Sequence, residues 1–447
     1  MDNSGHREML RPLGRGEKFI WLIDRASSFN FIIHARVNGG LAPAVLEKAL
    51  AAVQARHPLL RARIAQVGWT GAVFREDLVP AIPLRLVEDP GADWNKEAER
   101  ELQSNFNTDA GPLARCTLVK ESSDSAVIIM AFHHAIGDAL SGIYLLRDLL
   151  QAAELAASGR SPALPRLGTP PSMDKGLPQS VRGLRGAWGY LSFMSRLFTW
   201  FVKNGKPHIP KPDQKSAVGE RRVQMINREM APEVVKALLQ KARSEKTTLH
   251  GAISAAHALA MAELAGMNRP AACLIASDIN MRPRLSPQIG EDVGFYISGC
   301  LNLEHAGPGS NFWELARSIR NQLGQLLENG QPFHLFKSIT LAEAMFRPLG
   351  TGGFAARACA NYVAAANPGM FAVSNIGKVE IPSDYGRFHL ENFGFASSFS
   401  TTTDFCLHCA TFNGRLVCNF GVMGPVYSRA IAEKLADRTR RILAESV

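Results

Sequence analysis

The stretch that most constrains the fold runs from Ala126 to Gly142. Its first seven residues form an unbroken apolar run rich in β-branched side chains, which is typical of a buried strand. From Asp138 onward, apolar residues recur instead with the spacing of an amphipathic helix. His133 and His134 lie between the two elements. Because a strand-to-helix turn holds side chains rigidly at the edge of a sheet, we expect chemistry at this turn.

Residue type indicates what the turn does. A histidine titrates near neutral pH, so it can take a proton from an alcohol or an amine as that group attacks a carbonyl. Asp138 either caps the helix or pairs with a cation from elsewhere in the chain. The two histidines are alternatively packing residues or two ligands of a metal ion. Successive strand residues point to opposite faces, so both histidines cannot easily reach one ion, and we expect no metal.

The spacing His133-His134-x-x-x-Asp138 resembles the HHxxxDG motif of the chloramphenicol-acetyltransferase-like superfamily. That superfamily includes nonribosomal peptide condensation domains, plant BAHD acyltransferases, wax ester synthases and phthiocerol dimycocerosyl transferases. The resemblance implies that His134 is the general base, that His133 supports it, and that Asp138 anchors the loop. Ala139 replaces the glycine of the motif. If that position requires a positive φ, alanine there costs about 1 kcal/mol or more.

Other segments resemble the same superfamily, and they occur in the expected order. Residues 57–63 and 106–115 resemble segments that precede the histidine motif in condensation domains. An Arg-Pro pair at Arg282 resembles a segment whose arginine pairs with the motif aspartate, so the resemblance assigns Arg282 as the partner of Asp138. A forked guanidinium on one carboxylate would fix the geometry of the loop. Arg284 is the alternative partner.

A second strand-to-turn segment, Ser374-Asn375-Ile-Gly377, resembles the Ser-Asn-x-Gly segment of the alcohol O-acyltransferase branch. Ser374 or Asn375 would donate a hydrogen bond to an oxyanion or position the acceptor. The alternative is a polar turn at the end of a strand. The Asp-Phe-Gly-Trp-Gly segment of BAHD enzymes and the late motifs of wax ester synthases are not found. The resemblance therefore favours the alcohol O-acyltransferase or phthiocerol dimycocerosyl transferase branch.

The resemblance implies an α/β (α+β) fold in which two chloramphenicol-acetyltransferase-like subdomains form a pseudo-dimer around a tunnel. A length of 447 residues allows two such units. We predict a first subdomain over 1–160, a linker over 161–221 and a second subdomain over 222–447. Prolines crowd both ends of the linker, as expected for a connection between domains.

The linker holds nearly all of the net charge. Residues 160–222 contain twelve basic and three acidic residues, which gives +9 of the formal +10. Within them, residues 182–203 form a helical pattern with one polar stripe and a wide apolar remainder. This helix is either buried between the subdomains, or in peripheral contact with a membrane, or a docking site for a carrier protein or coenzyme A. No nucleic-acid-binding motif accompanies the charge, so we expect no nucleic acid partner.

Three further features indicate the compartment. The first eight residues are polar and lack a signal-peptide core, and no apolar run reaches 18 residues. Seven cysteines without regular spacing do not form a disulfide framework. Cys406 and Cys409 lie three apart in a predicted strand and therefore face opposite sides, so they cannot share a metal ion. We expect a cytoplasmic monomer. If residues 182–203 contact a membrane, the protein would also be peripheral to that membrane.

The sequence thus predicts an acyltransferase. An acyl group would move from a thioester, either acyl-CoA or an acyl carrier protein, to a hydroxyl acceptor, with His134 as base and no cofactor besides the coenzyme A or phosphopantetheine of the donor. One alternative is a free-standing condensation enzyme that forms an amide from an amine acceptor and carrier-bound substrates. A second alternative is a non-catalytic relative that binds acyl carriers or lipids.

Overall fold

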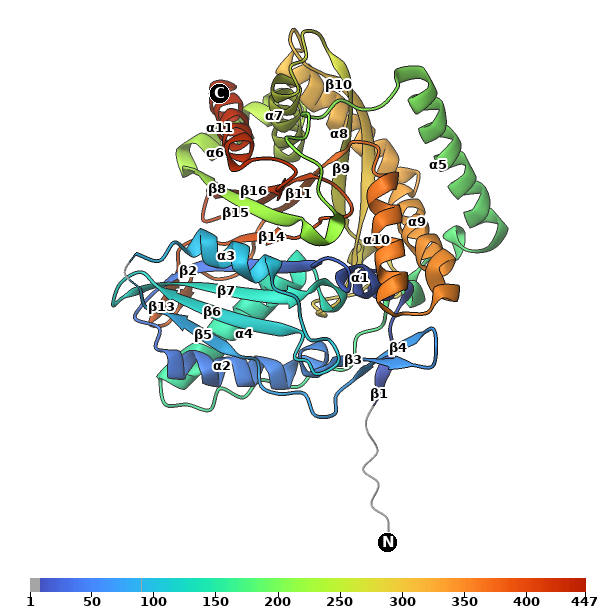
Figure 1. Cartoon of the computed structure of the whole chain (residues 1–447). Helices are drawn as coiled ribbons and strands as arrows, with labels where there is room; N and C mark the ends of the chain where they lie inside the picture. Colours follow the sequence, from blue (N-terminus) through green and yellow to red (C-terminus); the bar gives the residue numbers. More distant parts are fainter. Residues whose placement is uncertain (1–8, 90) are drawn as a thin grey trace.

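Two mixed β-sheets, one above the other in Figure 1, form the cores of two α/β subdomains in this computed structural model. The structure describes residues 9–89 and 91–447. The polar segment 1–8, which the sequence predicts not to be a signal peptide, lies outside the described residues. The predicted α/β class with two sheet-based subdomains is confirmed.

The first sheet has the strand order β12-β13-β2-β7-β6-β5, and β14 also pairs with β2. Its strands are β2 (Asn30–Asn38), β5 (Leu84–Val87), β6 (Ala114–Lys120), β7 (Ser125–His133), β12 (Asp384–Tyr385), β13 (Phe388–Leu390) and β14 (Gly394–Ser397). The helices α2 (Pro43–Arg56) and α4 (Ala139–Ala157) pack against each other beneath it, and α3 (Trp94–Gln103) lies on its other side, against the second subdomain.

The central strand β7 explains the apolar run that it carries. Ile128 and Met130 point into the core that contains α2 and α4, whereas Val127 and Ile129 point into the core that also contains the second sheet. A strand buried on both faces gains from an apolar side chain at every position. The apolar residues of β7 therefore follow one another without a break, rather than alternating with polar residues.

The second sheet has the order β10-β9-β11-β15-β16-β8. Its strands are β8 (Arg222–Met230), β9 (Ala271–Asn280), β10 (Ile297–Ala306), β11 (Phe371–Lys378), β15 (Phe405–Phe412) and β16 (Arg415–Gly424). The helices α6 (Pro232–Ser244), α7 (Leu249–Leu264), α8 (Phe312–Glu328) and α11 (Arg429–Glu445) cover the face turned away from the first subdomain.

The second subdomain contributes three strands to the first sheet, an arrangement that the sequence did not predict. The chain leaves the second sheet after β11, adds β12, β13 and β14 to the first sheet, and returns to the second sheet as β15. All three strands lie within the range 222–447. They cover the edge of β2, which would otherwise expose unpaired N–H and C=O groups. These crossing strands also fix the second sheet against the first.

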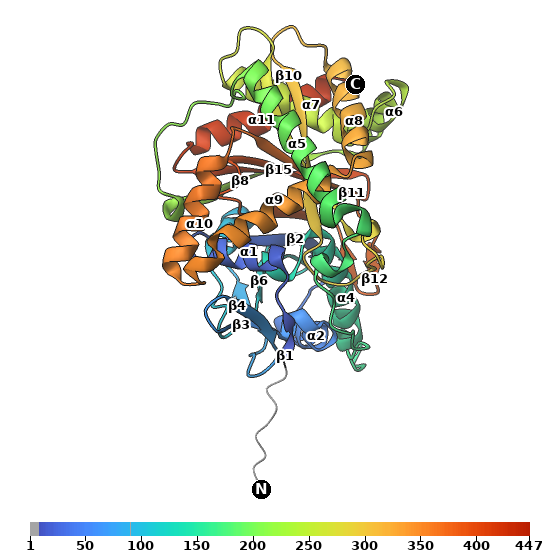
Figure 2. The same ribbon diagram turned by 90° about the vertical axis from the view of Figure 1, so that its right-hand side faces the viewer.

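The remaining elements lie beside and between these layers. They are a small sheet of β1 (Met9–Pro12), β4 (Gly71–Arg75) and β3 (Arg63–Val67), and the helices α1 (Arg15–Asp24), α5 (Gly183–Asn204), α9 (Gln331–Phe346) and α10 (Gly353–Ala366). In Figure 2 the helices α5, α9 and α10 lie on the side turned to the viewer. Among the described residues, no helix combines the length and the apolar character needed to cross a bilayer.

Candidate active site

The histidine pair lies where β7 ends. His133 is the last residue of β7, and His134 begins a short 3-10 turn that leads to Asp138 and α4. The backbone N–H of His134 donates to the carbonyl of Phe29 at 3.2 Å, which ties the turn to the neighbouring strand. His133 is fully buried, whereas His134 is partly exposed. The two side chains therefore have different surroundings, as the sequence predicted for adjacent strand-end residues.

Hydrogen bonding sets the tautomer of His134. Its Nδ1 lies 2.8 Å from the carbonyl oxygen of Gly137. A carbonyl can only accept, so Nδ1 carries the proton and Nε2 keeps its lone pair. Burial lowers the pKa of His134, and the bond to Gly137 and the charge of Asp138 offset that effect only in part. The ring is therefore neutral at pH 7, and Nε2 can accept a proton.

The structure brings Asp138 and Arg282 together. Nη1 of Arg282 donates to Oδ2 of Asp138 at 2.8 Å, and Nη2 donates to Oδ1 at 3.1 Å. Both side chains are almost completely buried. Arg282 also lies over the ring of Tyr296, 4.9 Å from its centroid. Arg284, the alternative partner, is not among the described residues that donate to Asp138. The paired charges link the start of α4 to the loop after β9.

Asp138 accepts further hydrogen bonds from its own helix and from the second subdomain. Its Oδ1 accepts from the backbone N–H and the hydroxyl of Ser141, both at 2.9 Å, as the N-cap of α4. Its Oδ2 accepts from the backbone N–H of Tyr296 at 3.2 Å. Burial alone would raise the pKa of the Asp138 carboxyl, but Arg282 and Ser141 outweigh it, so the pKa lies below its ordinary value. Asp138 is thus a fixed anion that joins both subdomains.

The position of the motif glycine is occupied without strain. Ala139 is the first residue of α4, and it is not among the residues with positive φ. The condition under which alanine would be costly, a positive φ, is not met, because a residue at the first helical position has an ordinary right-handed backbone. Its neighbour Gly137 is fully extended. Ala139 therefore gives no support to the non-catalytic alternative.

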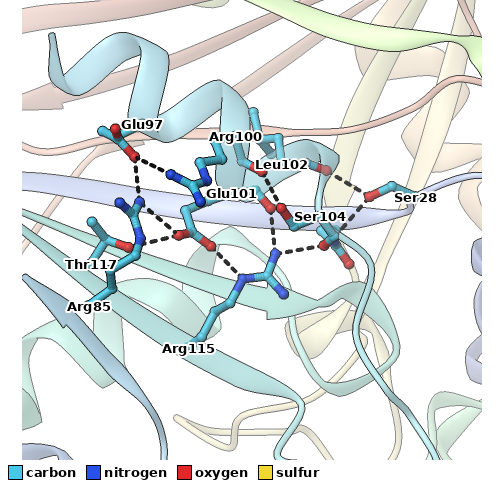
Figure 3. Close-up of polar contacts among 10 residues, drawn as sticks. Ser28, Arg85, Glu97, Arg100, Glu101, Leu102, Ser104, Arg115 and Thr117 are labelled. Carbon is cyan, nitrogen blue, oxygen red and sulfur yellow. Dashed lines mark hydrogen bonds and ion pairs between the residues drawn. The ribbon is translucent and has the colours of Figure 1, made fainter.

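A second polar network joins α3 to the strands of the first sheet (Figure 3). Glu101 pairs with Arg115 and accepts from the hydroxyl of Thr117 at 2.7 Å. The guanidinium of Arg115 lies 4.1 Å from the centroid of the Phe106 ring, and Phe106 in turn meets His133 edge-on. Burial alone would raise the pKa of Glu101, but Arg115 and Thr117 outweigh it and hold the pKa low. His133 therefore packs against Phe106 beside this charged network, and its Nε2 lies 3.4 Å from Oδ2 of Asp24.

Ser374 and Asn375 lie on β11, at the opposite wall of the site. Ser374 is buried and donates a hydrogen bond to the carboxylate of Asp278 on β9. Burial raises the pKa of Asp278 to about 6, and the bond from Ser374 offsets this only in part. Oδ1 of Asn375 accepts from the backbone N–H of Gly377 at 2.9 Å, which leaves its amide NH₂ as a donor. Asp278 is a site residue that the sequence did not predict.

Asp278 begins a row of polar side chains across the second sheet. Ser374 pairs in register with His408 on β15, which pairs with Asn419 on β16. The row faces the first subdomain, because Asn419 bonds to Nε2 of His34 on β2 at 2.8 Å. His408 bonds to the hydroxyl of Ser397 at 2.9 Å. Burial, together with a smaller effect of the nearby His134, lowers the pKa of His408 to about 3, so His408 is neutral and lies close to His134.

Two hollows meet at this wall. The first, about 250 Å³, lies between the start of α4 and the ends of β9 and β11, and its lining comprises Asp138, Ala139, Leu140, Asp278, Ile279, Asn280, Arg282, Tyr296, Ile297, Ser374, Asn375 and Ile376. The second, about 920 Å³, lies on the outside of the second subdomain. Its lining includes Lys236, Arg243 and Lys378 and one acidic residue, Glu380, which lies 3.6 Å from Lys378, so its charge is positive on balance. Asn375 lines both.

Cysteines and other candidate metal ligands do not gather here. Cys406 lies 3.3 Å from Nε2 of His408, whereas Cys409 lies 3.4 Å from the sulfur of Cys418. Cys406 and Cys409 therefore face opposite sides of β15. Within residues 9–89 and 91–447, no three His, Cys, Asp or Glu side chains are grouped so that they could hold an ion.

Comparison with protein families identifies this arrangement. A model described as "Condensation domain" matches residues 19–169, and a model described as "Phthiocerol/phthiodiolone dimycocerosyl transferase C-terminus" matches residues 219–420. Together these ranges include the histidine motif, Arg282 and Ser374. The chain is thus similar to the condensation-domain superfamily over most of its length. Members of this superfamily are acyltransferases and condensation enzymes with a chloramphenicol-acetyltransferase-like fold, so both the predicted fold and the predicted family are confirmed.

Curated relatives within the superfamily are multidomain synthetases. Malpinin synthetase from Mortierella alpina is 22% identical over 72% of this chain, which corresponds to 4% of that protein. Phosphinothricin tripeptide synthetase PhsC from Streptomyces viridochromogenes is 27% identical over 35% of this chain and 15% of its own length. This chain therefore spans a small part of the length of the relatives that it matches.

Solved structures share the fold over nearly the whole chain. Polyketide synthase associated protein 5 from Mycobacterium tuberculosis is 16% identical, with a TM-score of 0.70 and 98% of both chains covered. Trichothecene 15-O-acetyltransferase from Fusarium sporotrichioides is 13% identical, with a TM-score of 0.71, covering 98% of this chain and 94% of its own. The first condensation domain of the CDA synthetase is 16% identical, with a TM-score of 0.70.

Proposed function

We propose that this protein transfers an acyl group from a thioester to a hydroxyl acceptor and forms an ester. One observation carries the proposal: the neutral ring of His134 is held through Nδ1 by the carbonyl of Gly137, in the turn that leads to Asp138 and the cavity that Asp138 lines between the two subdomains. A positioned, neutral imidazole is the group that general-base catalysis of acyl transfer requires. The dimycocerosyl transferase match over residues 219–420 favours a hydroxyl acceptor.

The reaction follows from these groups. Nε2 of His134 takes the proton of the acceptor hydroxyl as its oxygen attacks the thioester carbonyl carbon. The carbonyl oxygen becomes an oxyanion, to which the Asn375 amide would donate a hydrogen bond, joined by the Ser374 hydroxyl if it turns away from Asp278. The carbon–sulfur bond then breaks, and His134 returns the proton to the leaving thiolate. The products are an ester and a free thiol, with every proton accounted for.

The larger hollow is the proposed route of the donor. Lys236, Arg243 and Lys378 give it a positive charge, which suits the phosphates of coenzyme A or the single phosphate of a phosphopantetheine arm. Because Asn375 lines both hollows, a thioester reaching inward from the larger one would arrive beside β11. The hollow thus fits either an acyl-CoA or an acyl carrier protein.

Asp278 supports a second candidate, the formation of an amide. A carboxylate with a pKa near 6 is ionised at pH 7 and would pair with the ammonium group of an amine acceptor. The condensation-domain match over residues 19–169 is consistent with that chemistry. In the first candidate, Asp278 would instead accept a hydrogen bond from a polar group of the acceptor other than the attacking hydroxyl, whose proton goes to His134.

A product screen tests both candidates. Acyl-CoA and acyl-carrier donors would be combined with alcohols and with amines, and the products would be identified by mass spectrometry. We expect esters, and we expect no ester from the His134→Ala variant under the same conditions. Amides without esters would replace the first candidate with the second. No product from any combination would leave the non-catalytic alternative.

A further inference from the structure

The helix α5 presents an apolar face to solvent. At the right of Figure 1 it lies along the outside of the molecule, and it falls between the two ranges matched by the family models. Five large side chains on its outer side are between 55% and 83% exposed: Leu184, Trp188, Leu191, Phe198 and Val202. Spacings of 4, 3, 7 and 4 place them on one side of a helix. We call these five residues the outer face.

A narrow inner side attaches α5 to the body of the protein. Within α5, Gly186 and Phe193 are fully buried. Phe193 stacks on His334 of α9, and Tyr190 accepts a hydrogen bond from Ser338 at 3.3 Å. A side chain at Gly189 would collide with His334, so glycine permits the close approach. The prediction of a helix buried broadly between the subdomains is therefore wrong: α5 is attached along one side and uncovered on the other.

The charge around the outer face has one sign. From residue 175 to residue 212 the chain has no aspartate or glutamate, while it has seven lysines and arginines. Three of these, Arg185, Arg196 and Lys203, follow one another at spacings of 11 and 7 and therefore form a line beside the outer face. All three are exposed. An apolar stripe edged by cations is the pattern of helices that lie in the surface of a bilayer.

We propose that the outer face of α5 docks this protein on an anionic lipid membrane, with the helix in the plane of the surface. Twenty-two residues give the helix a length of about 33 Å. It does not combine this length with the apolar character needed to span a bilayer. Trp188 and Phe198 would enter the boundary between headgroups and acyl chains, and Arg185, Arg196 and Lys203 would meet the phosphates. This docking is independent of the proposed reaction.

A second copy of the chain fits the outer face poorly. Pairing two outer faces would bring two segments of the same strong positive charge together, and like charges across an interface oppose association. A lipid surface has no such conflict. Leu341 and Met345 of α9 and Phe354 of α10 are also exposed, and both helices lie on the same side of the molecule as α5 (Figure 2).

Vesicle binding tests the proposal directly. The full chain would be mixed with vesicles of phosphatidylcholine containing phosphatidylglycerol, and bound protein would be separated by flotation at low and at high salt. We expect binding at low salt that weakens with salt and is absent for pure phosphatidylcholine. A wild-type protein that does not float with anionic vesicles at low salt would overturn the proposal.

Two variants and a matched control locate the contact. R185Q/R196Q/K203Q removes the basic line and should weaken vesicle binding about 10²-fold. K434Q/R440Q/R441Q removes the same charge from exposed positions on α11, on the other side of the molecule, and should change it by less than about threefold. L184S/W188S/F198S should also lose binding. Equal losses in the two charge variants, or full binding by the apolar variant, would contradict the proposal.

Turnover separates the membrane from other occupants. The α5 substitutions are at exposed positions, so the variants should fold and should turn over a short soluble thioester at the wild-type rate. A raised KM for a carrier-bound donor, without vesicle binding, would assign α5 to a carrier protein instead. Self-association that the apolar variant abolishes in sedimentation would assign it to a second copy. Either result would overturn the lipid proposal.

Discussion

Asp138 and Asp278 line the same cavity, yet their surroundings drive their carboxyl groups in opposite directions. Asp138 receives hydrogen bonds from Arg282, Ser141 and Tyr296, and its pKa lies below the ordinary value. Asp278 receives one from Ser374, and burial raises its pKa to about 6. Bonds to the charged form, rather than depth alone, thus decide which carboxylate remains an anion.

The difference separates an anchor from a binding group. A carboxylate whose hydrogen-bonding capacity is filled by the protein has none left for a substrate, and it stabilises the fold. A carboxylate with free capacity destabilises the folded state when ionised, and such groups are common where a ligand supplies the missing partner. Asp138 therefore holds the loop that carries His134, and under the proposed function Asp278 would be the group that meets the acceptor.

The largest effect should follow from the loss of the anchor. Asp138→Ala leaves Arg282 buried without its partner and should lower the free energy of unfolding by about 3–5 kcal/mol at pH 7, measured by urea denaturation. Because the folded pKa of Asp138 is depressed, its contribution is present above the unfolded pKa and is lost as the pH falls through the folded pKa. The deficit should therefore shrink in acid. Asp109→Ala, at an exposed aspartate, is the control and should change stability little.

A double-mutant cycle sharpens the same prediction. If Asp138 and Arg282 act as a pair, the Asp138→Ala/Arg282→Ala protein should lose less than the sum of the two single losses. The second substitution removes a charge that the first had already left without its partner. Strictly additive losses would show that the two residues do not pair.

Asp278→Asn should change the free energy of unfolding in the opposite direction and stabilise the protein. Its folded pKa is raised, so the stability that it confers when protonated is present below the unfolded pKa and is lost as the pH rises through about 6. The amide avoids that loss. At pH 8 the variant should gain about 1–2 kcal/mol, because the cavity leaves the carboxyl partly solvated, and at pH 4 it should gain little. Unfolding followed at both pH values measures this, and a loss at pH 8 would contradict it.

The same substitution should change the pH dependence of the reaction. With Asp278 ionised above about pH 6, kcat/KM for the acceptor should rise through that pH in the wild type. Asp278→Asn should remove this limb and lower kcat/KM at pH 7.5 by about tenfold, mainly through KM. The pKa of His134 is itself lowered by burial, and the variant should keep the limb that His134 contributes. An unchanged profile would remove Asp278 from acceptor binding.

Ala139→Gly should have the smallest effect. The first position of α4 has an ordinary helical backbone, so restoring the motif glycine releases no strain. Glycine is the poorer helix former, and the variant should lose at most about 1 kcal/mol of stability. Thermal melting and kcat measure the two effects. A clear gain in either would mean that alanine strains the loop.

Local features of this site could be predicted because adjacent residues determine them. The turn after β7, the cap of α4 by Asp138, and the Asn413-Gly414 hairpin turn, where both residues have positive φ, depend on a few neighbours in sequence. The pairing of Asp138 with Arg282 spans 144 residues, and only the resemblance to a known family made it predictable.

Features that depend on register were missed. Asp278, Ser374 and His408 lie on three strands far apart in the chain, and nothing near any one of them indicates that the strands align in one row. The addition of β12–β14 to the first sheet depends on the free edge of β2, which the periodicity of apolar residues does not reveal. For α5, the helical pattern is the same whether its apolar side faces the core or the solvent.

The most direct measurement is the turnover number of His134→Ala. Thiol release from an acyl thioester, in the presence of an acceptor that the product screen identifies, reports each transfer. His134→Ala should lower kcat by about 10²–10⁴-fold while its thermal unfolding stays close to that of the wild type. His389→Ala, at an exposed histidine on β13, should keep full activity. A folded His134→Ala protein with turnover near that of the wild type would contradict the account.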